Sequence, residues 1–186
     1  MAIIKAFHGT SVVFEKFDQS KARILNDFYG GGVAYFTENQ DVALAYAQAM
    51  AKKFKTNSLV VYDVDLNIKK LFNVNDRFTS ANLINFIKNT SVEDFARGAG
   101  LLRAGVDKYQ IIADLKAGTA NLSGDEVFKG LSRGMINTAN ARETIKKLGY
   151  TALRYNGGIN MQDVSKIKHS VYIMYYANDI KINKAL

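Results

Sequence analysis

Segments typical of β-strands lie toward the two ends of this chain, and most of the segments typical of helices lie between them. Short apolar runs that are rich in Val or alternate with polar residues occur at residues 3–7, 33–36, 58–66, 150–155 and 169–176. Apolar residues at helical spacing, interrupted by glycines, fill residues 79–147. A doubly wound sheet needs strands and helices that alternate along the chain. The order therefore predicts an α+β fold with a half-β core and a helical lobe.

Three capping-box patterns mark predicted helix starts, at Thr37, Ser123 and Asn140. In this pattern a hydroxyl or amide side chain and an acid or amide three residues later satisfy the first free N–H groups of a helix. We predict one helix after Thr37 and several in the middle of the chain, the last ending at Gly149 as the C′ residue. The helices of residues 79–140 are predicted to be an insertion in a single domain that spans residues 1–186.

The 186-residue chain contains no cysteine and only two histidines, His8 and His169. This composition excludes disulfides, a thiol nucleophile and metal centres built from cysteines or several histidines. No apolar run approaches the ~20 residues that cross a bilayer, and the N-terminal sequence lacks the pattern of a secretory signal. We expect a cytoplasmic protein that uses neither a metal nor a membrane.

The charge of the chain is strongly positive. It has 25 Lys and Arg against 17 Asp and Glu, which gives a formal net charge of +8 and an isoelectric point near 9.5. Such a charge attracts nucleic acids, acidic proteins and polyphosphate ligands by long-range steering. The basic residues are spread along the chain and form no basic tail. The charge thus predicts an acidic partner but no particular function.

The residues best suited to ligand chemistry lie near the N-terminus. His8 follows a predicted strand and precedes Gly9, whose bare backbone lets a ligand approach closely. Gly30–Gly32 form a turn into the strand that carries Tyr35, and Tyr46 follows on the predicted helix. Each residue alone is typical of a turn, a hairpin or a core tyrosine. Together, in this order, they suit a flat, amide-bearing ring attached to a sugar.

These motifs resemble those of the ADP-ribosyltransferase fold, in the histidine–tyrosine–glutamate branch shared by diphtheria-like toxins and poly(ADP-ribose) polymerases. The similar segments are His-Gly-Thr at 8–10, Tyr-Phe-Thr at 35–37, Ala-x-x-Tyr-Ala at 43–47, and residues 148–153 and 179–182. The likeness covers residues 3–75 and 140–182, and it extends to the transferase domains of phage and polyvalent mobile-element proteins. It implies a split, bent sheet and a transferase that uses NAD as co-substrate.

The resemblance implies a role in NAD binding for five residues. His8 would hydrogen-bond the adenosine-side ribose, and Gly9 would pair through its backbone with the nicotinamide carboxamide in a turn that Thr10 supports. Tyr35 would stack on the nicotinamide ring, and Tyr46 would pack against its other face. We therefore expect His8 and Tyr35 to face one cleft, with Tyr46 across from Tyr35.

The family also places a glutamate at the start of a late strand, where it binds the nicotinamide ribose 2′-OH and stabilises developing positive charge. In this chain that position falls near Ser170, where there is no carboxylate. The nearby polar residues Ser170, His169 and Gln162 are therefore the candidate catalytic residues.

The resemblance implies a mono-ADP-ribosyltransferase that moves ADP-ribose from NAD to a protein or nucleic acid and releases nicotinamide. The missing glutamate keeps two alternatives open. One is an inactive binding or inhibitor protein on the same scaffold, such as a phage-encoded factor that acts in the host cytoplasm. The other is an NAD glycohydrolase toxin, with water as the acceptor.

Three further groups each have two interpretations. Arg154 either anchors a phosphate or pairs with an acid. Asp63 and Asp65 alternate on a predicted strand, and they either act as an acid–base pair or line a solvated sheet face. The tyrosines within residues 172–176 either stack on bases or belong to the core of the sheet.

Overall fold

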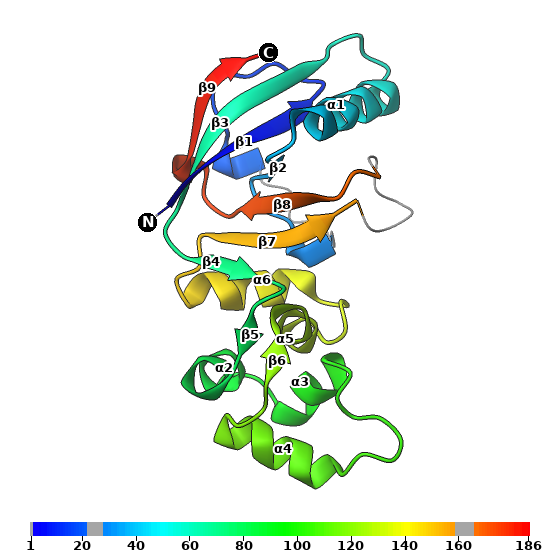
Figure 1. Cartoon of the computed structure of the whole chain (residues 1–186), viewed down its shortest axis with the longest axis vertical. Coiled ribbons are helices and arrows are strands. Elements are labelled where there is room, and N and C mark those ends of the chain that lie inside the picture. Colours follow the sequence, from blue (N-terminus) through cyan, green and yellow to red (C-terminus); the bar gives the residue numbers. More distant parts are fainter. Residues whose placement is uncertain (1, 22–27, 159–165) are drawn as a thin grey trace. The chain divides into compact units, whose positions relative to one another are not determined.

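The computed structural model describes residues 2–21, 28–158 and 166–186, which form two compact units (Figure 1). The first unit contains the described residues of 1–23, 32–71 and 151–186, and the second contains those of 24–31 and 72–150. The predicted helical stretch of 79–140 lies in the second unit. The same unit also contains residues 28–31, 72–78 and 141–150.

A bent, open sheet forms the first unit, and its strands follow the order β4-β7-β8-β2-β1-β3-β9. The strands are β1 (Ala2–Thr10), β2 (Ala34–Thr37), β3 (Val60–Ile68), β4 (Leu71–Asn73), β7 (Ala152–Gly157), β8 (His169–Met174) and β9 (Ile180–Ala185). The chain passes into the second unit within β4. One α-helix, α1 (Gln40–Phe54), and two short 3-10 turns, η1 (Gln19–Lys21) and η3 (Ala177–Asp179), complete the described part of this unit. The predicted α+β class is thereby confirmed.

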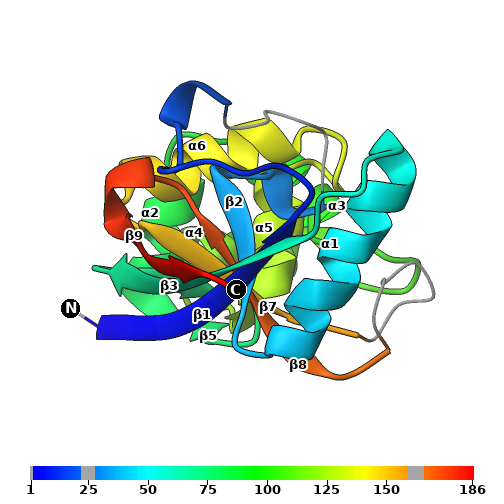
Figure 2. The ribbon, with the colours of Figure 1, turned by 90° about the horizontal axis from the view of Figure 1, so that it is seen from above.

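The two faces of this sheet are covered differently. Apolar side chains of one face, among them Phe36, Tyr62 and Tyr172, are buried in a single cluster on which Phe14 and Phe17 pack. α1 covers part of the opposite face, alongside β1 and β3 (Figure 2). Along β1 and β3, successive residues therefore alternate between the face of the aromatic cluster and the face on which α1 packs.

The predicted strands agree with the observed ones within a few residues, but β1 is longer than expected. The sequence predicts that Gly9 ends the strand, whereas β1 continues to Thr10. Gly9 stays in the sheet because it pairs with Val61 of β3.

The start of α1 also differs from the prediction. Its N-cap is Asn39, whose Oδ1 accepts from the N–H groups of Asp41 and Val42 at 2.9 and 3.1 Å. Thr37 cannot serve as the cap because it is the last residue of β2, and its hydroxyl accepts from the N–H of Asn39 at 3.1 Å. The capping box predicted at Thr37 is therefore wrong, although the helix it announced is present.

The second unit is helical. Its described elements are η2 (Phe28–Gly30), β5 (Arg77–Phe78), α2 (Ser80–Ile87), α3 (Val92–Gly98), α4 (Lys108–Ala117), β6 (Leu122–Ser123), α5 (Gly124–Leu131) and α6 (Thr138–Lys147). Buried phenylalanines such as Phe86, Phe95 and Phe128 form its core. The Phe95 ring lies against Gly130, where a Cβ would stand 2.6 Å from it, so α5 needs a glycine at this contact.

Two of the three predicted helix signals in this unit are confirmed. The Ser123 hydroxyl accepts from the N–H of Glu126 at 3.2 Å, and the Glu126 carboxylate accepts from the N–H of Ser123 at 2.8 Å. Gly149, with φ +84°, directly follows the C-cap of α6. The box at Asn140 is wrong, because Asn137 caps α6 by accepting from the N–H of Asn140 at 3.1 Å.

Candidate functional site

A row of side chains crosses five strands on the face that carries the aromatic cluster. The strand register pairs Arg154 with Tyr172 and Tyr172 with Phe36. The pairing of β1 with β2 then places His8 beside Phe36, their ring centroids 5.5 Å apart, and His8 pairs with Tyr62 of β3. This row joins His8, one of the predicted NAD-binding residues, to the strand that carries Ser170 and His169.

A chain of hydrogen bonds runs along this face from Arg154 to Glu38. Arg154 donates from Nε and Nη2 to Oγ of Ser170, at 3.2 and 2.8 Å. The Tyr172 hydroxyl bonds with Ser170 and donates to Oε1 of Glu38 at 2.7 Å. Burial raises the pKa of Tyr172, and the hydrogen bond to Glu38 and its negative charge raise it further. The hydroxyl is thus held in its protonated, donating form.

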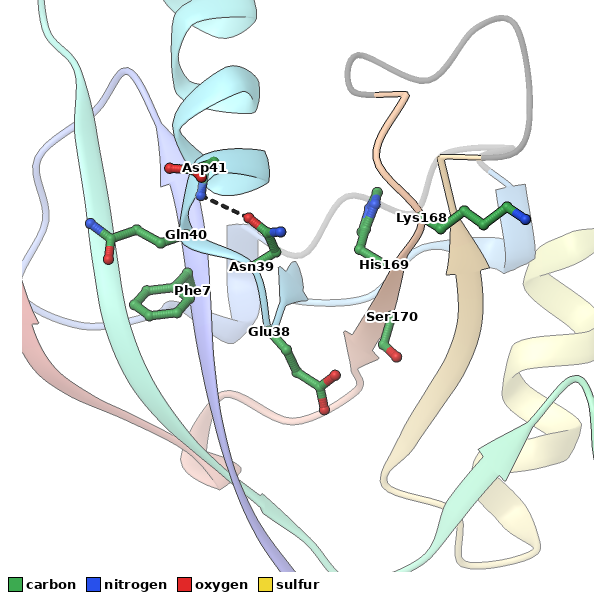
Figure 3. A pocket seen from close by; sticks show the side chains of 8 residues that line it. All are labelled: Phe7, Glu38, Asn39, Gln40, Asp41, Lys168, His169 and Ser170. Atoms are coloured by element: carbon green, nitrogen blue, oxygen red, sulfur yellow. Dashed lines mark hydrogen bonds between the residues drawn. The ribbon is translucent and has the colours of Figure 1, made fainter.

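Glu38 and Ser170 border a pocket at the end of β2 and the start of β8, beside Phe7 of β1 (Figure 3). The pocket has a volume of about 560 Å³ and is lined by Phe7, Glu38, Asn39, Gln40, Asp41, Lys168, His169 and Ser170. β2 and β8 pair in a register that brings Glu38, one residue beyond β2, opposite Ser170. A carboxylate therefore lies beside the strand position where the sequence has none.

The ring of His169 points away from Glu38 and Ser170, because neighbouring residues of a strand face opposite sides. Its Nδ1 lies 2.7 Å from the carbonyl oxygen of Ile167, a contact that makes Nδ1 the protonated nitrogen. The ring rests against Gly157, where a Cβ would stand 2.5 Å from Nε2. His169 thus lines the pocket without joining the hydrogen-bond chain. The third candidate, Gln162, lies outside the described residues.

His8 is enclosed by aromatic rings. The centroids of Phe17, Phe36 and Phe14 lie 5.3, 5.5 and 6.2 Å from the centroid of its ring. Its Nδ1 lies 2.9 Å from the carbonyl oxygen of Tyr35. Burial lowers the pKa of His8, and the hydrogen bond to this carbonyl opposes the shift. In this structure His8 is a neutral side chain that links β1 to β2.

The prediction that His8 and Tyr35 face one cleft is wrong. Phe7 pairs with Thr37, so His8 lies on the same face as Phe36, and the Tyr35 side chain points to the opposite face. The contact between the two residues is a hydrogen bond from the His8 ring to the backbone carbonyl of Tyr35. Tyr46 lies on α1, which packs on the face to which Tyr35 points.

Gly9 and Thr10 both have clear structural roles. A Cβ on Gly9 would stand 1.7 Å from the carbonyl oxygen of Ala43, so α1 packs directly on the backbone of β1. The Thr10 hydroxyl accepts from the N–H of Val12 at 3.2 Å and supports the turn after β1. The close packing of α1 explains the glycine without a ligand.

For the remaining candidates except Arg154, the observed contacts and burial favour structural roles. Asp63 accepts from Nδ2 of Asn183 at 3.1 Å, and Asp63 and Asp65 lie half-exposed on the face opposite the aromatic cluster. Their alternation with buried Val64 favours the sheet-face role of the two over an acid–base pair. Tyr172 and Tyr175 are buried, which favours the sheet core over stacking on bases.

Glu38 is the site residue that the sequence analysis missed. The sequence placed it inside a capping box, although the alternation on β2 puts it on the same face as Phe36. That it lies beside Ser170 follows only from the pairing of β2 with β8.

Within the described part of the chain, no group of three or more Asp, Glu or His side chains is arranged to hold a metal ion. No helix among the described elements has the length and apolar character needed to cross a membrane.

Comparisons with known proteins give no match: no family model, no curated protein and no solved structure is similar to this chain. The interpretation of the site therefore depends on its residues and geometry.

The enclosed position of His8 leads to a prediction about stability and pH. Because the folded state lowers the pKa of His8 below its usual 6.5, the unfolded state binds more protons below that pH. We expect the contribution of His8 to the free energy of unfolding to be fully present above pH 6.5. As the pH falls below 6.5, the free energy of unfolding should fall progressively, by at most about 1.4 kcal/mol per pH unit. Urea unfolding between about pH 8 and pH 5 measures the effect.

The variant His8→Gln, which keeps a neutral hydrogen-bond donor, should flatten this part of the pH profile. His169→Gln serves as the control and should keep it. Equal pH dependence in the wild type and His8→Gln would contradict the prediction.

Proposed function

We propose that this chain is a mono-ADP-ribosyltransferase that binds NAD, transfers ADP-ribose to a protein or nucleic-acid acceptor and releases nicotinamide. The observation that carries the proposal is the Glu38 carboxylate opposite Ser170. The position of Ser170 is the one at which the resemblance requires a glutamate. The fold supplies from β2 the negative charge that the late strand lacks.

The chemistry of the transfer requires such a charge. As the bond between nicotinamide and ribose breaks, positive charge develops on the ribose, and a fixed carboxylate stabilises it. The Tyr172 hydroxyl holds Glu38 from one side, while Glu38 is itself exposed at the pocket. A held but accessible carboxylate suits this role better than the hydroxyl of Ser170, which is already bonded to Arg154.

The pocket is lined by side chains from both faces of the sheet. Phe7 belongs to the sheet face on which α1 packs, whereas Glu38 and Ser170 belong to the face of the aromatic cluster, and all three line one pocket. A ligand in this pocket therefore meets side chains of both faces. Under this proposal the nicotinamide ribose lies near Glu38, and Phe7 provides the apolar wall for a flat ring.

A second function, NAD-independent binding without turnover, is favoured by the surroundings of His8. Phe14 and Phe17 pack on its ring, so a ribose reaches His8 only if the segment that carries these two rings moves. The opposite orientation of Tyr35 removes the predicted partner of His8 in a common cleft. Both observations fit a scaffold that binds a partner and performs no chemistry.

Incubation with NAD labelled in its adenylate moiety, with and without cell lysate, tests these functions. Transfer of label to a macromolecule in the lysate is the result expected from the transferase. Release of free ADP-ribose without lysate would instead identify an NAD glycohydrolase. If the label remains in NAD under both conditions, the transferase proposal is wrong and binding without turnover takes its place.

The positive charge of the chain directs the search for the acceptor. At +8, the protein is expected to label nucleic acid or acidic proteins in preference to basic ones. Treating the labelled lysate with nuclease or protease separates these two acceptor classes.

A further inference from the structure

We propose that the guanidinium of Arg154 binds a pyrophosphate group on the sheet face of the first unit. In the sequence, Arg154 either anchors a phosphate or pairs with an acid. Among the described residues, no carboxylate lies within ion-pair distance of it. The inference deepens the proposed function and rests on it only in assigning the pyrophosphate to NAD.

The other arginines of the described chain differ from Arg154 either in ion pairing or in exposure. Arg77, Arg97, Arg133 and Arg142 each pair with an acid. Arg103 is exposed to solvent and donates to the carbonyl oxygen of Gly100. Arg154 alone among these six is half-buried and without a paired acid, a state in which a cation gains by binding an anion.

The hydrogen bonds of Arg154 leave three of its five guanidinium donors unused. Nε and one N–H of Nη2 donate to the single oxygen of Ser170. Of the five donors of the group, the two on Nη1 and the second on Nη2 have no acceptor in the described structure. These donors form a planar fork, and such a fork matches two oxygens of a phosphate.

The position of Arg154 in the sheet favours the binding of an anion, although the Glu38 carboxylate belongs to the same hydrogen-bond chain. Glu38 is two hydroxyls away along the hydrogen-bond chain, and β8 lies between the strands β7 and β2. Ser170 fixes the guanidinium, so little side-chain freedom remains to be lost on binding. The chain's net positive charge adds a long-range attraction for polyphosphate.

Calorimetric titration with inorganic pyrophosphate at low ionic strength tests the site. We expect Arg154→Gln to weaken binding at least about tenfold, the range of one charge-assisted hydrogen bond. Arg154→Lys keeps the charge but not the fork and should bind with intermediate affinity. Arg103→Gln, which removes the same charge from an exposed site, should stay within about twofold of the wild type.

Three results would overturn the inference: no binding of pyrophosphate by the wild type, unchanged binding by Arg154→Gln, or an equal loss in Arg103→Gln. Circular dichroism of each variant establishes that it is folded, and Arg154→Lys retains the test if Arg154→Gln does not fold.

The same titrations with NAD distinguish this inference from the proposed function. If NAD binds equally to the wild type and to both Arg154 variants, the assignment of the NAD pyrophosphate to Arg154 is wrong while the transferase proposal stands. If pyrophosphate binding depends on Arg154 and NAD does not bind, the anion site stands and the NAD-dependent function is wrong. Loss of both affinities in Arg154→Gln is the result that supports the two together.

Discussion

Replacing Glu38 with glutamine is expected to lower the rate of nicotinamide release from NAD by about 10²–10³-fold. Removing one group that stabilises charge in a transition state typically has an effect of this size. Glutamine preserves the length of the side chain and can still accept from the Tyr172 hydroxyl, so the change removes the negative charge and little else. Nicotinamide release under saturating NAD measures the effect.

Asp41→Asn is the matched control, because Asp41 lines the same pocket and the substitution removes the same charge. Asp41 lies in the first turn of α1, where losing a carboxylate costs the helix only about 0.3–1 kcal/mol. We expect its rate to stay within about threefold of the wild type. Equal rates in Glu38→Gln and the wild type would show that Glu38 does not supply the missing carboxylate.

Replacing Gly9 with alanine is expected to destabilise the first unit by about 3 kcal/mol or more, at or beyond the upper end of the usual cost of overpacking. The new Cβ would stand 1.7 Å from the carbonyl oxygen of Ala43 and 3.0 Å from the backbone nitrogen of Ala47. Because both atoms belong to the helix backbone, no side chain can rotate to relieve the clash. α1 must move off β1, and thermal or urea unfolding measures the loss.

Gly105→Ala provides the comparison for this stability measurement. A Cβ at Gly105 meets no atom within 4 Å, but its φ of +82° makes the backbone unfavourable for alanine. That conformational cost is about 1–2 kcal/mol. If Gly9→Ala is no less stable than Gly105→Ala, α1 does not pack on Gly9 as the structure describes.

Features fixed within a few neighbouring residues could be predicted from the sequence. The capping box at Ser123 was correct because both of its hydrogen bonds form within four residues. The same pattern at Thr37 was misleading, because Thr37 is held in the sheet by Phe7 and Val171, both far away in the chain. A local pattern predicts correctly only where no long-range pairing competes for its residues.

In the candidate site, too, positions along the chain could be predicted from the sequence, whereas side-chain orientations could not. Ser170 and His169 were identified from the resemblance, because their place in the chain can be counted from the closing strand. The direction in which each of these two side chains points could not be predicted in this way. The structure places Ser170 in the hydrogen-bond chain and turns His169 away from it.

The sequence by itself determined the α+β class, the places of the main strands, the helix after β2 and the positive charge of the chain. Only the tertiary structure decided which side chains meet. Glu38 contacts Tyr172 across 134 residues, and His8 and Tyr35 lie on opposite faces because Phe7 pairs with Thr37. Side chains alternate between the two faces of a strand, so a shift of one residue in register would exchange the faces. That register is set by the packing of the whole sheet, and no segment of the sequence contains it.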